Sequence, residues 1–349
     1  MTERILMDGN RATAEGAIAG GCRHFFGYPI TPQSHIPEHM SKRMPEVGGV
    51  YLQAESEVAA INMCYGAAAT GAKVMTSSSS PGVSLMQEGI SYMYGAELPC
   101  VIVNMVRGGP GLGNIAAAQS DYWLSTRGGG HGDGQMITWA PWSVQECYDL
   151  TCEAFDLALK YRAPVSVLGD GILAQMMEPV VTREPLPVEY PKPEWSVGGP
   201  RNGRPKRVIS SIYIAPEVLE DLNHRLYARY AQAAIEDLRF EEYGAEDPDI
   251  LVCAYGISAR VCQTAVDMVA AQGLKVRMFR PITLFPFPSA QIATWAERVK
   301  QVLVVELSMG QFVEDVRLSV EGRCPVQFSG HTGGVLHTPE EVAGILGQM

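Results

Sequence analysis

The stretch Gly27-Tyr28-Pro29-Ile30-Thr31-Pro32, followed 26 residues after Thr31 by Glu57, decides the fold class of this 349-residue chain. The turn comes directly after the apolar pair Phe25-Phe26, so we expect it where a strand ends and a helix begins. In open α/β sheets, ligands bind at that edge of the sheet. Two prolines restrict the backbone around the Thr31 hydroxyl. The turn alone is compatible with a rigid connection and with one wall of a ligand site.

Helical and strand-like stretches alternate around this turn, which is typical of an α/β protein with a mainly parallel sheet covered on both faces. In the first half we expect helices at 10–19, 55–70, 82–95 and 144–161, and strands at 72–75, 100–106 and 164–168. In the second half we expect strands at 250–254, 275–279, 301–306 and 325–328, and helices at 259–271 and 312–320.

The length of the chain favours two domains rather than one core. A proline-rich stretch from 179 to 205 is a poor setting for regular structure, and one or two surface helices are expected at 213–240. We therefore predict a first domain at 1–180, a linker with surface helices at 181–245, and a second α/β domain at 246–349.

Charge and cysteine spacing exclude several function classes. The net charge of −11, from 27 basic and 38 acidic residues, argues against nucleic acid or anionic membranes as partners. No stretch reaches the roughly 18 apolar residues of a membrane span, and the N-terminus has no signal-peptide pattern. The eight cysteines contain no Cys-x-x-Cys pair, so we expect no zinc ribbon and no iron–sulfur site on this chain. A reducing cytoplasm is the simplest setting.

Glu57 is the first candidate for chemistry. It opens a helix of small and apolar residues, so its carboxylate benefits from the helix dipole. A carboxylate beside a packed interior also needs a partner, and a cofactor nitrogen is one possibility. Glu55 lies nearby on another face, and we prefer Glu57.

Two further segments carry polar groups at predicted strand ends. The hydroxyl-rich run 77–80 before Pro81-Gly82 either caps a helix or lines a cofactor pocket. Arg107 ends a buried strand and opens a glycine-rich loop, where its charge suits an anionic ligand or a surface salt bridge. The same loop contains Gly111-x-Gly113-x-x-Ala116, a weak dinucleotide pattern that lacks an acidic strand end downstream.

Two Gly-Asp-Gly triplets, at 132–134 and 169–171, are similar to the beginning of the motif that holds the magnesium diphosphate of thiamine diphosphate. Asn202 lies at a suitable distance from the second triplet, but inside the proline-rich linker. We therefore interpret both triplets as turns. His131 is either a proton carrier near the site or a loop histidine without a role.

Five phrases in this order identify a family. They are YPITP at 28–32, QAESEVAAIN at 53–62, SSSPG at 78–82, the Arg107 loop, and VVE at 304–306 with Gly310-Gln311. Over essentially its full length the chain resembles the α subunit of 2-oxoacid:ferredoxin oxidoreductases, most closely the 2-oxoisovalerate (3-methyl-2-oxobutanoate) subclass. The resemblance implies a pyrimidine-binding domain for thiamine diphosphate, followed by a transketolase-C-terminal-like α/β domain.

The resemblance also implies roles for individual residues. Glu57 would hydrogen-bond N1′ of the aminopyrimidine, while Thr31 and Arg107 would bind the carboxylate or nascent oxyanion of the substrate. The residues that it implies for cofactor binding are Glu57, Tyr28, Pro29, Ser79 and Ser80. No residue of the chain is expected to bind a metal.

The implied reaction is oxidative decarboxylation of a 2-oxoacid to acyl-CoA, carbon dioxide and reduced ferredoxin, in branched-chain amino acid catabolism and anaerobic metabolism. The chain would act in a heteromer. A β subunit would carry the diphosphate and its Mg²⁺, and γ and ferredoxin-like δ subunits would complete it, with the 4Fe–4S clusters also on partners.

Four other interpretations stay open from the sequence. The chain could be the α subunit of a 2-oxoglutarate enzyme, because the loop 119–135 contains Tyr122, Trp123, Arg127 and His131 and could serve either substrate. It could be a self-contained thiamine-diphosphate decarboxylase or transketolase-like enzyme. It could be a non-catalytic assembly subunit, or a nicotinamide enzyme that uses the Gly111 loop.

Overall fold

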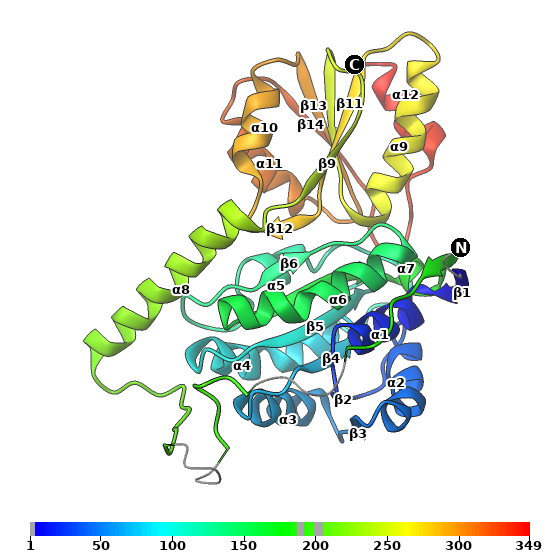
Figure 1. Cartoon of the computed structure of the whole chain (residues 1–349). Helices are drawn as coiled ribbons and strands as arrows, with labels where there is room; N and C mark the ends of the chain where they lie inside the picture. The colour runs from blue at the N-terminus through cyan, green and yellow to red at the C-terminus, as the bar shows by residue number, and fades with distance from the viewer. Residues whose placement is uncertain (1–3, 187–191, 199–204) are drawn as a thin grey trace.

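The computed structural model describes residues 4–186, 192–198 and 205–349, in two stacked α/β units (Figure 1). The lower unit contains a seven-stranded sheet in the order β12-β6-β7-β5-β4-β2-β3. All its neighbouring strands are parallel except β12, which runs antiparallel to β6. Its strands are β2 (His24–Gly27), β3 (Val50–Gln53), β4 (Val74–Ser78), β5 (Cys100–Val106), β6 (Ile137–Trp139), β7 (Pro164–Asp170) and β12 (Thr283–Phe285).

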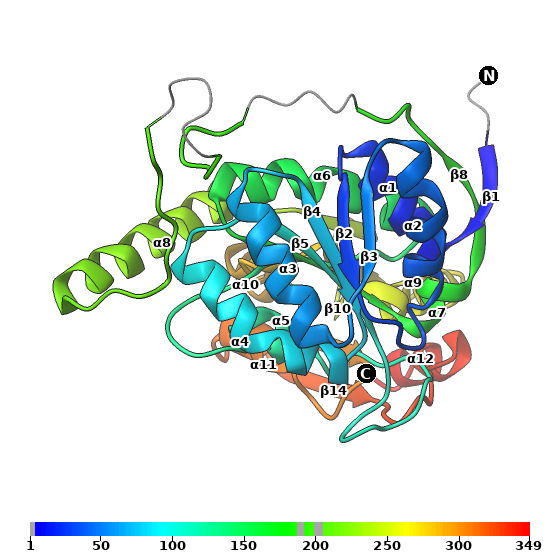
Figure 2. The same cartoon turned by 90° about the horizontal axis from the view of Figure 1, so that it is seen from below.

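Helices cover both faces of this sheet, and two apolar clusters fill the two interfaces (Figure 2). One face is covered by α1 (Gly9–Ala19), α2 (His35–Glu46) and α6 (Val144–Tyr161). The other is covered by α3 (Glu57–Ala69), α4 (Pro81–Gly95) and the long α8 (Pro216–Glu236). A separate antiparallel pair joins β1 (Arg4–Asp8) to β8 (Met177–Val181), and two short helices are α5 (Tyr122–Thr126) and α7 (Gly171–Gln175).

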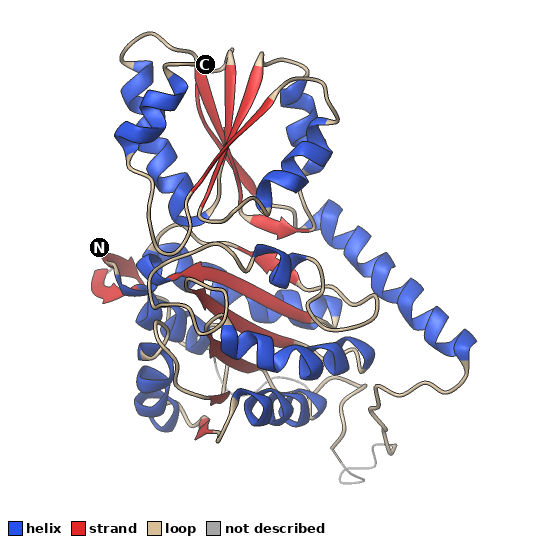
Figure 3. Cartoon of the chain, turned by 180° about the vertical axis from the view of Figure 1, so that it is seen from behind, coloured by secondary structure: helices blue, strands red, loops and turns tan. Residues whose placement is uncertain are grey.

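The upper unit contains a five-stranded sheet between two pairs of helices (Figure 3). Its order is β14-β13-β10-β11-β9, and only β9 is antiparallel. The strands are β9 (Phe240–Gly244), β10 (Ile250–Cys253), β11 (Val276–Pro281), β13 (Gln301–Glu306) and β14 (Val326–Gly330). The helices are α9 (Gly256–Ala270) and α12 (Pro339–Leu346) on one face, and α10 (Ser289–Ala296) and α11 (Phe312–Val320) on the other.

The predicted fold class is confirmed, and the ends of several elements move. The expected helices at 144–161 and 312–320 and the strand at 301–306 have the observed bounds. The strand expected at 72–75 instead covers Val74–Ser78, so it carries hydroxyl groups to the sheet edge. The expected surface helices at 213–240 form the single helix α8. Strand β12 belongs to the second half of the chain but pairs with β6 in the first sheet. The bounds predicted for the two domains therefore stay a prediction.

Gln119 joins the two units through a buried set of hydrogen bonds. Its backbone N–H donates to Leu307 O at 2.9 Å, and its side-chain Oε1 accepts from the Leu307 N–H at the same distance. Its Nε2 donates to Tyr255 O at 2.9 Å, and Ser258 Oγ donates to its Oε1 at 2.8 Å. Every polar atom of this amide therefore has a partner at the junction of the two units.

None of the helices in the described ranges combines the length and apolar composition that crossing a bilayer requires.

We predict that Gln119→Ala destabilises the chain. The truncation leaves the buried Leu307 N–H and Tyr255 carbonyl without their side-chain partner, which costs about 2–4 kcal/mol of unfolding free energy. Urea denaturation measures the loss. Gln348→Ala, at an exposed position, is the control and should leave the midpoint unchanged. Equal midpoints for Gln119→Ala and the unmodified chain would contradict the bridging role.

Candidate functional site

The predicted site residues lie at one edge of the seven-stranded sheet. Parallel strands β2, β4 and β5 end at this edge, so the turn after Gly27, the serines after β4 and the loop that begins at Arg107 meet there. The segment after β3 leads to Glu57 at the first position of α3. The strand-to-helix position that the sequence predicts for the Thr31 turn is therefore correct.

Arg107 connects three of these segments. Its Nη1 donates to Thr31 O at 2.9 Å and its Nη2 donates to Leu112 O at 2.9 Å. Its backbone N–H donates to Ser80 Oγ at 3.0 Å. The guanidinium is buried, its Nε has no hydrogen-bond partner, and no carboxylate pairs with it in the part of the chain that the structure describes. The surface salt bridge considered from the sequence is therefore wrong, and the positive charge stays uncompensated.

Glu57 is a buried carboxylate without a protein partner. Its side chain is 5% exposed and makes no hydrogen bond or ion pair with the described residues, whereas Glu55 is exposed before the helix begins. Ser56 caps the helix, because its Oγ accepts from the Ala59 N–H at 3.2 Å. The capping task therefore falls to Ser56, which leaves the Glu57 carboxylate free to accept a donor from a ligand.

Gly82 leaves the space that this carboxylate occupies. A Cβ atom on Gly82 would lie 2.5 Å from Glu57 Oε1 and would also collide with Ser78 Oγ. The Ser78 hydroxyl lies against the same glycine. Like the hydroxyls of Thr76 and Ser79, it is buried and has no hydrogen-bond partner among the described residues. Unpartnered buried hydroxyls are costly unless a ligand pairs with them, so the site has the donors and acceptors for a nitrogen-rich ring.

Ser80 does not cap α4 with its side chain, so the capping interpretation is wrong. Its backbone has φ +26° and ψ −84° and its hydroxyl turns to Arg107, donating to the Arg107 carbonyl at 3.3 Å. A positive φ is unfavourable for serine, and the Asn104 Oδ1 acceptor 3.1 Å from the Ser80 N–H helps to hold it. The serine turn is therefore positioned by the sheet edge rather than by its helix.

Three supporting residues were missed from the sequence. Gln33 donates to Tyr28 O at 3.2 Å and accepts from Ser77 Oγ at 2.6 Å, so it connects the first turn to the serine run. Asn104 Nδ2 donates to Asp121 Oδ2 at 2.9 Å, and burial raises the pKa of Asp121. A lone asparagine in the apolar strand CVIVNMV was the available signal for this buried pair.

The predicted site residues differ in burial. Tyr28 and Pro29 are exposed, whereas Ser79 is fully buried and Thr31 is half-buried. The structure therefore brings Thr31, Ser80 and Arg107 into direct contact and places Glu57 against Gly82, with Tyr28 and Pro29 outside.

The loop at 119–135 is anchored to the upper unit. Tyr122 donates to Asp315 Oδ2 at 2.6 Å, and Arg127 Nη2 lies 3.0 Å from Asp315 Oδ1. Gln311 accepts from the Trp123 N–H at 3.0 Å. His131 contacts Ser91, whose hydroxyl donates to the His131 carbonyl at 2.9 Å. The Arg127 charge is therefore paired within the chain.

Two glycine patterns have structural explanations. The segment 111–116 leads to an isolated bridge between Arg107 and Ala117 and not into a helix, so the dinucleotide interpretation is wrong. In the second Gly-Asp-Gly triplet, Asp170 ends β7 and caps α7 by accepting from the N–H groups of Ile172 and Leu173. It is a strand-to-helix junction and not a free turn. Asn202 lies outside the described residues.

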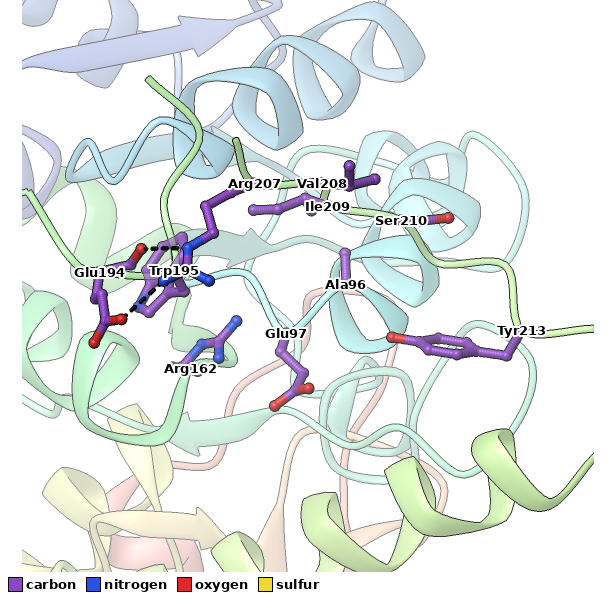
Figure 4. A pocket seen from close by; sticks show the side chains of 10 residues that line it. All are labelled: Ala96, Glu97, Arg162, Glu194, Trp195, Arg207, Val208, Ile209, Ser210 and Tyr213. Atoms are coloured by element: carbon purple, nitrogen blue, oxygen red, sulfur yellow. Dashed lines mark hydrogen bonds and ion pairs between the residues drawn. The ribbon is translucent and has the colours of Figure 1, made fainter. Parts of the chain in front are cut away.

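A separate cavity of about 450 Å³ lies at the opposite edge of the sheet (Figure 4). It borders the residues that follow α4 and α6, among them Glu97 and Arg162. The Arg162 guanidinium stacks over the Trp195 ring at 4.7 Å, and Arg207 pairs with Glu194 at 2.8 Å. None of the predicted site residues lines this cavity.

Comparison with known families matches both units. Residues 15–227 match the family described as "Pyruvate flavodoxin/ferredoxin oxidoreductase, thiamine diP-bdg", and residues 248–342 match "Pyruvate:ferredoxin oxidoreductase core domain II". The chain is 47% identical over 346 residues to the ketoisovalerate oxidoreductase subunit VorB of Methanothermobacter marburgensis, covering 97% of this chain and 98% of that one. It is 35% identical over 376 residues to the 2-oxoglutarate synthase subunit KorA of Methanothermobacter thermautotrophicus, covering all of both.

Two solved structures share the fold. The 2-oxoglutarate:ferredoxin oxidoreductase from Magnetococcus marinus, solved with 2-oxoglutarate, coenzyme A and succinyl-CoA, superposes with a TM-score of 0.91 at 28% identity. The match covers 99% of this chain and 65% of that one, so this chain spans about two thirds of its length. A split-gene transketolase, an inactive beta4 tetramer, superposes with a TM-score of 0.61 at 14% identity, over 98% of this chain.

We predict that Gly82→Ala disturbs the site and the fold together. The new methyl group would push on Glu57 and Ser78, and overpacking of this kind costs about 1–3 kcal/mol. Urea denaturation measures the loss of unfolding free energy. The matched control is Gly66→Ala in α3, where nothing lies within 4 Å and the helix should gain up to about 1 kcal/mol. Unchanged stability of Gly82→Ala would mean that the carboxylate is not fixed against this glycine.

Proposed function

Because the chain belongs to the pyruvate flavodoxin/ferredoxin oxidoreductase family, we propose that it is the α subunit of a coenzyme A-acylating 2-oxoacid:ferredoxin oxidoreductase. Its substrate is 2-oxoisovalerate or another branched-chain 2-oxoacid. The family indicated by the sequence motifs is therefore confirmed. The prediction that the chain is an oxidoreductase subunit is confirmed as well.

One observation carries the proposal: Glu57 is buried, has no partner among the described residues, and shares the space at Gly82 with the unpartnered Ser78 hydroxyl. These groups fit the aminopyrimidine of thiamine diphosphate, which offers ring nitrogens and an amino group. Glu57 would hold a proton at N1′, and Ser79 and Ser80 would line the ring. When bound, thiamine diphosphate supplies the electron sink for decarboxylation.

Thr31 and Arg107 act at the substrate end of the same edge. Arg107 Nη1 fixes the Thr31 carbonyl, so the Thr31 side chain is held beside a guanidinium that no carboxylate in the described ranges neutralises. A buried cation of this kind stabilises the carboxylate or oxyanion of a 2-oxoacid. Tyr28 and Pro29 restrict the entrance to this space.

The remaining cofactors belong to partner subunits. The chain has no Cys-x-x-Cys pair, which supports a placement of the 4Fe–4S clusters on γ and ferredoxin-like δ subunits. Of the aspartates in the two Gly-Asp-Gly triplets, Asp170 lies at a strand end, and its side chain already caps α7. This supports a β subunit as the holder of the diphosphate and its Mg²⁺. The setting is the cytoplasm, in anaerobic branched-chain amino acid catabolism.

The pairing of Arg127 favours a branched-chain substrate over 2-oxoglutarate. A 2-oxoglutarate enzyme needs a second cation for the distal carboxylate, and Arg127 in the predicted substrate loop is paired with Asp315. The identity to the ketoisovalerate subunit, 47%, also exceeds the 35% to the 2-oxoglutarate subunit. A 2-oxoglutarate enzyme remains the second candidate, because the solved relative with that activity superposes closely.

Substitution of Glu57 tests the cofactor role. In the complex co-expressed with its genomic neighbours, Glu57→Gln should lower kcat about 100-fold or more, because an amide cannot share the N1′ proton as a carboxylate does. The complex should still assemble, since glutamine has the same shape. Viologen reduction with 2-oxoacid and coenzyme A measures turnover, and size-exclusion chromatography measures assembly.

The matched control is Glu55→Gln, two residues away and exposed, which should keep near-normal turnover. Near-normal turnover of Glu57→Gln would overturn the Glu57 assignment. Turnover by the purified chain without partners would instead favour the self-contained decarboxylase or transketolase-like enzyme. Glu57 far from the cofactor in a structure of the complex would favour a non-catalytic assembly subunit.

Substrate preference provides a second test. We expect kcat/KM for 2-oxoisovalerate to exceed that for 2-oxoglutarate by about 10-fold or more, because burying the distal carboxylate without a free cation is costly. A panel of 2-oxoacids in the viologen assay gives the ratio. A preference for 2-oxoglutarate would replace the branched-chain assignment without affecting the Glu57 test.

A further inference from the structure

Two histidines and a glutamate that have no role in the site described above meet at the C-terminal end of the upper sheet. His331 follows β14, His337 ends the loop after it, and Glu341 lies in the first turn of α12. One potential ligand atom from each of these three side chains lies within 4.8 Å of the others. The two imidazole rings have centroids 4.3 Å apart, and His331 Nε2 is 2.8 Å from Glu341 Oε1.

His337 has a ring nitrogen without a partner. The residue is 4% exposed, and its Nδ1 is buried with no hydrogen bond. Its other nitrogen, Nε2, lies 3.0 Å from Ser329 Oγ, so the ring is oriented by a hydroxyl on the preceding strand. Such a bond on the far nitrogen is how proteins usually orient a metal-binding imidazole.

Glu341 does not complete the capping pattern that its position predicts. The segment Thr338-Pro339-Glu340-Glu341 has the capping-box spacing, and Thr338 Oγ1 accepts from the Glu341 N–H at 3.2 Å. The glutamate of a capping box normally turns back to the N-cap amide, but here it is directed to His331. The three side chains therefore converge on one point from three segments.

We propose that His331, His337 and Glu341 bind one divalent transition-metal ion, for which Zn²⁺ is the matching probe. Two imidazoles and a carboxylate are a common zinc ligand set, with water in the fourth position. Ligands bonded to zinc at about 2.0–2.2 Å lie about 3.4 Å apart in a tetrahedron. The separations in this cluster are at most 4.8 Å, so each has to close by about 1.4 Å at most. His331 and Glu341 are not buried, so their side chains can move toward the buried His337.

The ion would fix the loop that contacts the Arg107 loop. Gly333, between the two histidines, accepts a hydrogen bond from Asn114 Nδ2 at 2.9 Å, and Gly334 packs against Ala116 so closely that a Cβ would collide with it. Asn114 and Ala116 lie in the segment that Arg107 holds through Leu112. A metal ion bound by these three side chains, at the C-terminal end of the upper sheet, would therefore stabilise the contact between the two units.

The experiment is a zinc titration of the full-length chain after dialysis against a chelator. We expect one Zn²⁺ per chain with a dissociation constant below about 1 µM by competition with a chromogenic chelator, and a higher melting temperature with zinc. Glu341→Gln and His331→Gln should each weaken binding about 10-fold or more. The control is Glu340→Gln, the exposed neighbour in the same helical turn, which should bind within about two-fold of the unmodified chain.

Cobalt distinguishes this site from binding by cysteine, since the chain has eight free cysteines. Bound Co²⁺ should show no thiolate charge-transfer absorption, and zinc should slow amide exchange in residues 331–341 of the unmodified chain but not of Glu341→Gln. Thiolate absorption, absence of stoichiometric binding, or equal affinity of Glu341→Gln would overturn the proposal. In that case the three residues form a hydrogen-bonded surface cluster only.

Discussion

The buried Arg107 guanidinium is the interaction on which the candidate site depends. It joins the carbonyl of Thr31 to the carbonyl of Leu112, while its own backbone pairs with Ser80. Three segments that are far apart in sequence are thereby fixed at one sheet edge. Both bonds go to carbonyl oxygens, and no carboxylate in the described ranges compensates the charge, which can therefore act on an anion. Arg107 therefore both holds the segments of the candidate site together and supplies its positive charge.

Sequence patterns predicted the parts of this site that depend on local rules. The YPITP turn, the first-turn Glu57 and the Arg107 strand end all follow from where parallel strands stop. The connections between these segments were not predictable, because they join residues far apart in sequence. Gln33 pairs with Ser77, 44 residues away, and Asn104 pairs with Asp121, 17 residues away. The serine run was ambiguous for the same reason: whether Ser80 caps its helix or turns to Arg107 depends on a loop 27 residues later.

The fold shows the same division between local and long-range information. Helices with a clear cap, such as α6 after Ser143, were predicted to the residue. Two short strands, β12 and β3, were not predicted from the sequence. β12 has three residues and pairs antiparallel with a strand far earlier in the chain, and β3 has four residues with an exposed pattern. Such elements exist because a sheet edge offers hydrogen-bond partners, which no local periodicity reveals.

The upper unit explains why the VVE motif at 304–306, with Gly310-Gln311, accompanies the motifs of the candidate site. Glu306 is fully buried and accepts from the backbone N–H groups of Phe312 and Val313, so it fixes the start of α11. Gln311 then reaches the loop at 119–135, where its side chain accepts from the Trp123 N–H and donates to Ser120 O at 2.7 Å. The upper unit therefore helps to position the loop at 119–135.

The open side of the site agrees with the proposal of a partner subunit. Leu112 and Ile115, in the loop that Arg107 holds, are 79% and 64% exposed. Exposed apolar side chains beside a polar site are unfavourable in water, and the proposed partner subunit would cover them. The exposed apolar side chains of this loop and the unpartnered Glu57 at the same sheet edge therefore both support the proposed partner subunit.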